Sequence, residues 1–307
     1  MSRRGAGADR AAAAAGPSRG ARRRAQDAPA TADDPLGAAS LMADVEWLAA
    51  PARHGRGSRS ADARAVAAWL GDELRQAGYA PTTLAIPEVD DQVDVVAVYG
   101  PRDDLAPTIV VTAHYDHLGE VDGTLYPGAD DNASGVAVAL GVARDLAARR
   151  DVAGRVVFVF TGAEELGLYG ARAYAEAPAY PLGQTRVVIN LDMVGRRFFE
   201  GTADQDATLG AVGLPGDATL LELGEAAAAA AGVALVAVSA ELLTLVGEDW
   251  RSDDWVFRDR GVPAVHLSTG LNPDYHQPTD TPDRVSRAQL ERVARFLRGW
   301  VSRLAAR

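Results

Sequence analysis

Five strongly apolar, β-branched segments, separated by helical patterns, constrain the fold of this chain more than any other feature. Each segment is continuously apolar rather than strictly alternating, which is typical of strands covered on both faces. The segments span residues 93–98, 108–113, 155–160, 186–191 and 262–267. Helical patterns lie at 61–77, 134–149, 217–231 and 252–260, and from Ser286 onward. We therefore expect an α/β fold, a three-layer sandwich around a mostly parallel central sheet, in a single domain over residues 34–307.

Two of the expected helices begin at recognisable capping residues. Ser60 precedes the first helical pattern, and serine is a residue type whose side chain accepts a hydrogen bond from the first helical turn. Ser286 precedes the last pattern, where Gln289, three positions later, predicts a capping box.

The composition excludes several kinds of chemistry. The 307 residues include no cysteine, and all 31 basic residues are arginine, so lysine is absent as well. These absences exclude disulfides, thiolate zinc sites, iron–sulfur clusters, Schiff-base lysines and the lysine of a phosphate-binding loop. The formal net charge of −11 argues against nucleic acid as a partner, because binding phosphates requires a basic face.

Residues 1–33 form an Ala- and Arg-rich tail that we expect to be disordered, because it has too little apolar surface to pack. Its first 30 residues contain seven arginines and two aspartates, a balance of +5, so the remainder carries −16. The tail lacks the apolar segment of about 7–15 residues that a secretory signal needs. No apolar run approaches the roughly 18 residues of a membrane span. We therefore expect no membrane insertion and, for the chain as it stands, a cytoplasmic address.

Residues that can bind metal follow the expected strands. Because the carboxyl ends of parallel strands share one edge of a sheet, these residues should converge there. His114 and Asp116 follow the strand at 108–113, Glu164 and Glu165 follow 155–160, Asp192 follows 186–191, and His276 lies in the loop after 262–267. The turn GADDNASG at 128–135 adds Asp130 and Asp131.

Two histidines with three or more carboxylates and no thiolate favour zinc. One zinc ion would use three of these groups, whereas five ligands with one bridging carboxylate fit two ions about 3.5–4 Å apart. Either Asp130 or Asp131 could be the bridge. The site also needs a general base that is not a ligand, and the pair Glu164-Glu165 can supply one ligand and one base.

These motifs resemble the dinuclear zinc aminopeptidases of peptidase clan MH. The resemblance rests on the Glu164-Glu165 pair and on AHYDH (113–117), GADDNASG (128–135), NLDMVG (190–195) and DYHQPTDTPD (274–283), and it covers roughly residues 40–304. The clan includes bacterial leucyl aminopeptidases, glutamate carboxypeptidase II and glutaminyl cyclase. Its members share a zinc-dependent exopeptidase fold, and many are secreted or periplasmic.

The resemblance implies an aminopeptidase that hydrolyses N-terminal residues from peptides with a free N-terminus, using metal-activated water. Two zinc ions per chain would be bound by His114 and Asp192 on one side and by Glu165 and His276 on the other, with Asp131 bridging. Glu164 matches the position of the general base, and Asp116 matches a carboxylate that orients the first histidine. Tyr275 matches a tyrosine that donates to the oxyanion. The resemblance also implies a cis peptide bond between Asp131 and Asn132.

Other functions of the same fold remain open. A carboxypeptidase or another amide hydrolase of the clan is the alternative, and Arg196, Arg197 and Arg251 are candidates to bind a terminal carboxylate. A metal-free binding protein is a further alternative. Many relatives have Ser-Asp-His where this chain has Ser252-Asp253-Asp254, so that stretch is given no function.

Three further expectations concern the surroundings of the site. His117 is expected at the rim of the site or behind a ligand, and His266 as a packed, hydrogen-bonded imidazole beneath it. The segment from Arg196 to Leu214 has low periodicity and is expected to be a loop that borders the substrate pocket, with Phe198 and Phe199 as an apolar wall.

Overall fold

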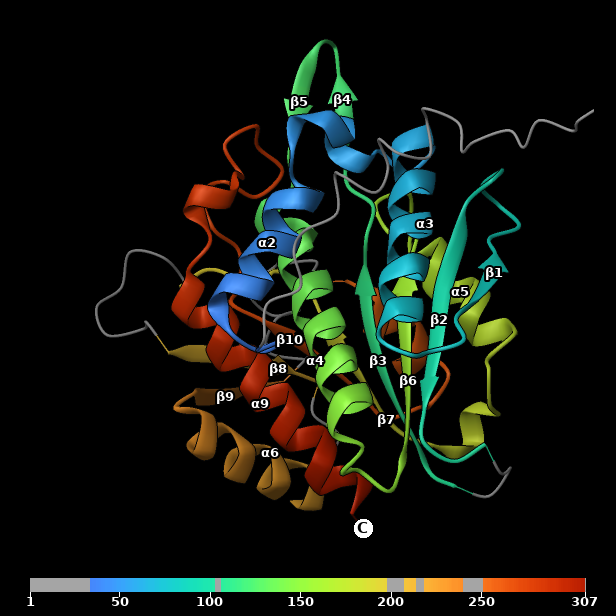
Figure 1. Cartoon of the computed structure of the whole chain (residues 1–307), viewed down its shortest axis with the longest axis vertical. Coiled ribbons are helices and arrows are strands. Elements are labelled where there is room, and N and C mark those ends of the chain that lie inside the picture. The colour runs from blue at the N-terminus through green and yellow to red at the C-terminus, as the bar shows by residue number, and fades with distance from the viewer. Residues whose placement is uncertain (1–33, 103–105, 198–206, 214–217, 240–250, 307) are drawn as a thin grey trace, which may run out of the picture.

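The computed structural model describes residues 34–102, 106–197, 207–213, 218–239 and 251–306. The expected disordered tail and the side chains of Phe198 and Phe199 lie outside this range. Over the described residues the chain forms an eight-stranded sheet in the order β1-β2-β6-β3-β7-β10-β8-β9 (Figure 1).

The centre of the sheet is parallel and its flanks are mixed. Strands β6, β3, β7 and β10 run parallel to one another. On one flank, β2 pairs antiparallel with both β1 and β6. On the other flank, β8 pairs antiparallel with β10 and parallel with β9. Their bounds are β1 Thr82–Ala85, β2 Val93–Tyr99, β3 Thr108–His114, β6 Arg155–Thr161, β7 Thr185–Leu191, β8 Thr208–Val212, β9 Ala234–Val238 and β10 Ala264–Ser268. All five expected strands are therefore confirmed.

Helices cover both faces of the sheet, as the continuous apolar runs predict (Figure 1). One face packs against α2 (Ala38–Leu48), α3 (Ala61–Gln76), α4 (Gly135–Arg149), α6 (Ala218–Ala231) and α9 (Arg287–Ala305). The other face packs against α5 (Tyr169–Glu176) and α8 (Asp253–Arg258). Strand β3 shows the principle, because Ile109 and Val111 enter the first core and Val110 enters the second. The three-layer α/β fold is confirmed.

Short elements connect these layers. The hairpin β4 (Gly119–Val121) and β5 (Thr124–Tyr126) projects from one end of the molecule (Figure 1). Short helical segments lie at η1 (Pro51–Arg56), which is kinked at His54 and Gly55, and at η3 (Leu182–Gln184) and η4 (Pro282–Arg284). The irregular turn η2 (Ala129–Ser134) leads into α4.

The two capping predictions have different outcomes. Ser60 Oγ accepts from Ala63 N at 3.0 Å, as expected. Ser286 Oγ accepts from Gln289 N at 3.3 Å, but the expected capping box is wrong, because the Gln289 side chain donates to the carbonyl of Thr208 at 3.0 Å. Gln289 therefore ties α9 to the start of β8 instead of closing its own helix.

The expectation of a continuous loop from Arg196 to Leu214 is also wrong. Within it, Thr208–Val212 forms β8, a fully buried strand of the central sheet. The strand is short, and it pairs with β10 and β9 much later in the chain, so local periodicity does not reveal it.

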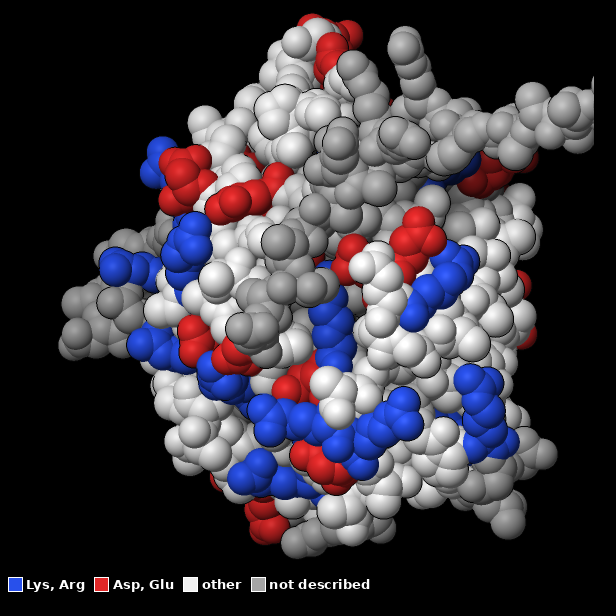
Figure 2. All heavy atoms as spheres, viewed as in Figure 1, with Lys and Arg blue, Asp and Glu red and all other residues white. Residues whose placement is uncertain are grey.

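The outer surface mixes charges of both signs. Figure 2 shows arginines and acidic side chains interleaved across the face on which α4 and α9 lie. Several of them form ion pairs, including Arg298 with Asp145 and Asp151, and Arg295 with Glu291. Among the described helices, none has the length and apolar character that crossing a bilayer would require.

Candidate metal centre

The candidate ligands converge at one edge of the sheet because their strands are neighbours. His114 is the last residue of β3, and in the parallel register it pairs with Thr161, the last residue of β6. Glu164 and Glu165 follow β6, and Asp192 follows β7 directly. The structure thus brings together all five ligands expected from the sequence.

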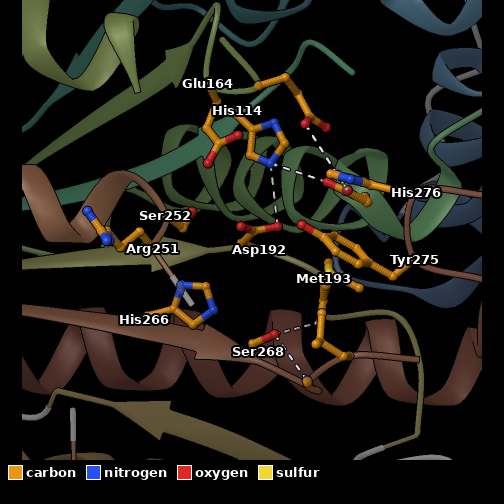
Figure 3. A pocket seen from close by; sticks show the side chains of 14 residues that line it. His114, Glu164, Asp192, Met193, Arg251, Ser252, His266, Ser268, Tyr275 and His276 are labelled. Carbon is orange, nitrogen blue, oxygen red and sulfur yellow. Dashed lines mark hydrogen bonds and ion pairs between the residues drawn. The ribbon is translucent and has the colours of Figure 1, made fainter. Parts of the chain in front are cut away.

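Asp131 lies at the middle of this group, with its two carboxylate oxygens facing different partners. Its Oδ1 lies 3.4 Å from His114 Nε2, and its Oδ2 lies 3.2 Å from His276 Nε2. His114 Nε2 is also 3.4 Å from Asp192 Oδ1, and His276 Nε2 is 3.3 Å from Glu165 Oε2 (Figure 3). The arrangement forms two adjacent sets of donors that share one carboxylate.

The donor set is suited to zinc. Ligand atoms of His114, Asp131 and Asp192 lie within 4.8 Å of one another, as do those of His117, Asp131 and Glu165. Imidazole and carboxylate donors at this separation can surround an ion of borderline softness.

The carboxylates at the centre are held ionised. Burial alone would raise the pKa of Asp131, but the imidazoles of His117, His114 and His276 outweigh it and hold that pKa well below its ordinary value. The pKa values of Glu165 and Asp192 are likewise lowered, because their histidine neighbours outweigh the effect of burial. Metal ligands must be deprotonated, so these three groups are in the required state.

Glu164 differs from its neighbour Glu165. Figure 3 shows its carboxylate beside His114 and facing Asp192 across the pocket. Burial raises the pKa of Glu164 well above its ordinary value, and the nearby charge of Asp192 adds to this effect, although His114 opposes it. A carboxylate with a raised pKa accepts a proton more readily than an ordinary one.

Asp116 holds the turn that carries both glutamates. Its carboxylate accepts from the backbone N–H of Glu164 at 3.1 Å, from that of Glu165 at 3.3 Å and from Ser58 Oγ at 2.5 Å. His114 Nδ1 lies 3.3 Å from the backbone oxygen of Asp116 and 3.8 Å from its carboxylate. In the structure, Asp116 therefore orients His114 chiefly through its main chain.

The side chains of Asp130 and Asp131, the two candidates for a bridging carboxylate, point in different directions. The Asp130 carboxylate accepts from Gly195 N at 2.7 Å and from Asn272 Nδ2 at 3.1 Å, away from the histidines.

The peptide bond after Asp131 is cis, as the sequence resemblance implies.

His117 lies behind the candidate ligand Glu165, one of the two positions expected for it, and not at the rim. It is fully buried, and its Nδ1 lies 2.9 Å from Glu165 Oε1 and 3.6 Å from Asp131 Oδ2. The sequence signal for it is a second histidine three residues after His114.

Two residues that the sequence did not single out position the main chain of the site. Arg56 is fully buried and donates to five backbone carbonyls, those of Leu48, Tyr115, Pro127, Gly128 and Asp131. Asp280 accepts from the N–H groups of Asp130 and Asp131 at 3.0–3.1 Å. Together they fix the turn on which Asp131 lies.

A cavity of about 190 Å³ opens beside the candidate metal centre. In addition to the five candidate ligands and Glu164, its walls include Met193, Arg251, Ser252, His266, Ser268, Gly270, Leu271 and Tyr275. Tyr275 is 37% exposed, and its ring stacks on that of His276 at 3.9 Å.

Known proteins share both sequence and fold with this chain. Residues 94–301 match peptidase family M28. The chain belongs to this family. All five candidate ligands and Glu164 fall within the M28 match, so the resemblance drawn from the motifs is confirmed at the level of the family.

Two relatives in sequence and one solved structure illustrate these similarities. The chain is 31% identical over 209 residues to the probable lipoprotein aminopeptidase LpqL of Mycobacterium tuberculosis, covering 60% of this chain and 40% of LpqL. It is 29% identical over 208 residues to aminopeptidase YwaD of Bacillus subtilis, covering 65% of this chain and 42% of YwaD. The chain thus spans about two fifths of the length of these two relatives. The aminopeptidase LapA of Legionella pneumophila shares the fold, with a TM-score of 0.73 and 20% identity over 89% of this chain and 73% of LapA.

Proposed function

We propose that this M28 protein is a dinuclear zinc aminopeptidase that removes N-terminal residues from peptides. The observation that carries the proposal is the position of Asp131, whose Oδ1 and Oδ2 face separate sets of donors. His114 and Asp192 complete one set, and Glu165 and His276 complete the other. A carboxylate shared in this way is the arrangement expected of a bridging ligand between two ions.

The proposed ligands are two imidazoles and three carboxylates, and they fit zinc in number and kind. Bound zinc would polarise the scissile carbonyl and lower the pKa of a water molecule. The protein holds these ligands in place, because Asp116 fixes the turn of Glu164 and Glu165, while Arg56 and Asp280 fix the turn of Asp131.

Glu164 is the general base of the proposal. Its carboxylate takes a proton from the attacking water and passes it to the nitrogen of the leaving amine. The raised pKa of Glu164 favours both proton transfers. Its carboxylate binds the proton of the water more tightly than an ordinary glutamate would, and it can still release that proton to the amine. Tyr275 stands at the mouth of the pocket, stacked on His276, where its hydroxyl can donate to the developing oxyanion.

The part of the pocket nearest the proposed ions favours a free amine in the substrate. Carboxylates line the side of the cavity nearest the proposed ions and would bind an α-ammonium group. Of the arginines considered for a carboxypeptidase, Arg196 is buried and donates to Asp274 at 2.9 Å. That pairing favours a supporting function for Arg196 in the loop of His276.

A comparison of substrates tests the proposal. The zinc-loaded protein should hydrolyse aminoacyl p-nitroanilides with a free α-amine and should leave the same compounds intact once the amine is acetylated. Equal hydrolysis of the acetylated substrates, or hydrolysis only of peptides with a free C-terminal carboxylate, would refute it.

A further inference from the structure

The cavity beside the candidate metal centre has a second side whose chemistry is opposite to that of the first. Figure 3 shows Arg251, Ser252 and His266 grouped on the side of Asp192 that faces away from His276. Residues of this side offer hydrogen-bond donors, whereas the other side carries the carboxylates. The cavity is therefore divided between acceptors and donors.

His266 forms the floor of the donor side. It lies on β10 and is 5% exposed, and its Nδ1 is 3.3 Å from Asp254 Oδ1 and 3.3 Å from Asn190 Nδ2. These contacts occupy one edge of the ring, and Figure 3 shows the other edge directed into the cavity, toward the space between Asp192 and Ser268. Burial alone would lower the pKa of His266, but Asp254 outweighs it and raises that pKa. Because Nδ1 faces the amide donor of Asn190, Nε2 on the cavity side carries an N–H whether the ring is neutral or protonated.

Ser252 adds a hydroxyl donor. It is 2% exposed, and its Oγ accepts from Asn190 Nδ2 at 2.8 Å. Although it precedes α8, its side chain makes no capping bond. While Oγ accepts from Asn190, its O–H remains a donor that Ser252 can offer to a ligand.

Ser268 lines the same cavity without adding a donor. Its Oγ donates to the carbonyl of Met193 at 3.3 Å and accepts from Gly270 N at 3.1 Å. Both hydroxyls therefore line the cavity, but only the O–H of Ser252 is available to donate a hydrogen bond to a ligand.

Arg251 places a positive charge at the edge of the cavity. Its guanidinium lies 5.4 Å from the ring centre of Trp255, and its side chain lines the cavity wall. A carboxylate can accept from the Ser252 hydroxyl and from the ring N–H of His266, whereas a neutral aliphatic side chain offers them no acceptor.

We propose that the donor side of this cavity binds the carboxylate side chain of an N-terminal glutamate or aspartate, so that acidic residues are the preferred first residues of the substrate. The inference rests on the proposed aminopeptidase function. An N-terminal acidic residue matches both halves of the cavity, because its α-ammonium meets the carboxylates and its side chain meets the donors.

The test compares kcat/KM for glutamyl, aspartyl, glutaminyl and leucyl p-nitroanilides. The zinc-loaded protein should prefer glutamyl to leucyl by at least about tenfold, the ratio that corresponds to one net hydrogen bond with a charged group. His266→Leu should reduce the glutamyl-to-leucyl ratio by about tenfold or more while leucyl hydrolysis is retained. Ser252→Ala should reduce the ratio less, and Ser268→Ala, the matched control, should leave it unchanged.

Several results would overturn the inference. They are a preference of the unaltered protein for leucyl over glutamyl substrate, equal rates for glutaminyl and glutamyl substrates, or an unchanged ratio in both His266→Leu and Ser252→Ala. Zinc content and thermal unfolding of each variant confirm that the fold is retained.

Failure of the aminopeptidase proposal itself gives a different pattern, namely no hydrolysis of any aminoacyl substrate. The pocket is then tested by calorimetric titration of the zinc-loaded protein with L-glutamate and L-leucine. Tighter binding of L-glutamate, weakened in His266→Leu, supports the inference, and equal binding refutes it.

Discussion

His117 Nδ1 lies 2.9 Å from Glu165 Oε1, in a part of the site where His117 is fully buried. The second ring nitrogen, Nε2, has no hydrogen-bond partner among the described residues. A buried N–H without an acceptor costs about 1–3 kcal/mol, and orphaned N–H groups are rarer than under-satisfied acceptors. The proton is therefore best placed on Nδ1, from which His117 donates to Glu165. A histidine that bound metal through Nδ1 would instead leave its Nε2–H unpaired, so we interpret His117 as the support of a ligand.

His117→Ala should accordingly weaken zinc binding at the Glu165 position by about 10- to 100-fold, the usual cost of losing such a support. His117→Asn, which can place an amide donor near the former Nδ1, should recover part of the affinity. Zinc competition with a chelator of known affinity measures both effects, with His54→Ala at an exposed histidine as the control. An unchanged affinity in His117→Ala would show that Glu165 does not depend on this contact.

The two neighbouring glutamates should behave differently when replaced. Glu165→Ala removes a proposed ligand and should lower zinc content, as should His276→Ala. Glu164→Ala should keep its zinc and lose about 10²- to 10⁴-fold in kcat, since proton transfer by a positioned base contributes that much. Metal analysis and steady-state kinetics on the same preparations distinguish the two. If Glu164→Ala emptied the site while Glu165→Ala stayed full, the assignment of the pair would be reversed.

Zinc binding should release protons at neutral pH. Burial would lower the pKa of His276, but its bonds to Asp131 and Glu165 outweigh it and raise that pKa to about 10 in the metal-free protein. The pKa of His114 is likewise raised, because Glu164 and Asp192 outweigh burial. Both rings are then protonated at pH 7 and must become neutral to bind metal, so about two protons should leave per pair of ions.

The apparent zinc affinity should therefore rise with increasing pH and fall as acid competes for the two imidazoles. Calorimetric titrations in buffers of different ionisation enthalpy count the protons directly. Zinc uptake without proton release at pH 7 would contradict the ion pairs described for His114 and His276.

Arg56 offers a test of how the site is held in place. Its guanidinium is fully buried and serves five backbone carbonyls, and burial lowers its pKa to about 10. Arg56→Met should destabilise the fold by about 3–5 kcal/mol, because it leaves several buried acceptors unpaired. The exposed Arg59 provides the control, and Arg59→Met should change stability by less than about 0.5 kcal/mol. Urea unfolding of both variants measures the difference, and similar values would show that Arg56 is dispensable.

How far the sequence predicts this structure depends on whether a signal is local. The strand ending at His114 is predictable because both of its faces are buried, so every residue from Thr108 onward is constrained. Strand β8 is not predictable in this way, because its five residues form a strand by pairing with strands that lie more than twenty residues away in the sequence.

The same distinction applies within the site. The ligands form local motifs at the strand ends, whereas the function of Arg56 is invisible in the sequence, because its acceptors are main-chain atoms that any residue would offer. His266 shows an intermediate case. Its packing on β10 was expected, but its place in the wall of the cavity depends on Asp254 and Asn190, which come from other elements.

A zinc titration of the chelator-treated protein tests the central claim most directly. Bound zinc and turnover of the best aminoacyl p-nitroanilide are followed together as zinc is added. The account predicts that both saturate at two equivalents per chain, and that Asp131→Ala, which removes the shared carboxylate, abolishes this saturation together with turnover. Binding of less than one equivalent without hydrolysis would contradict it.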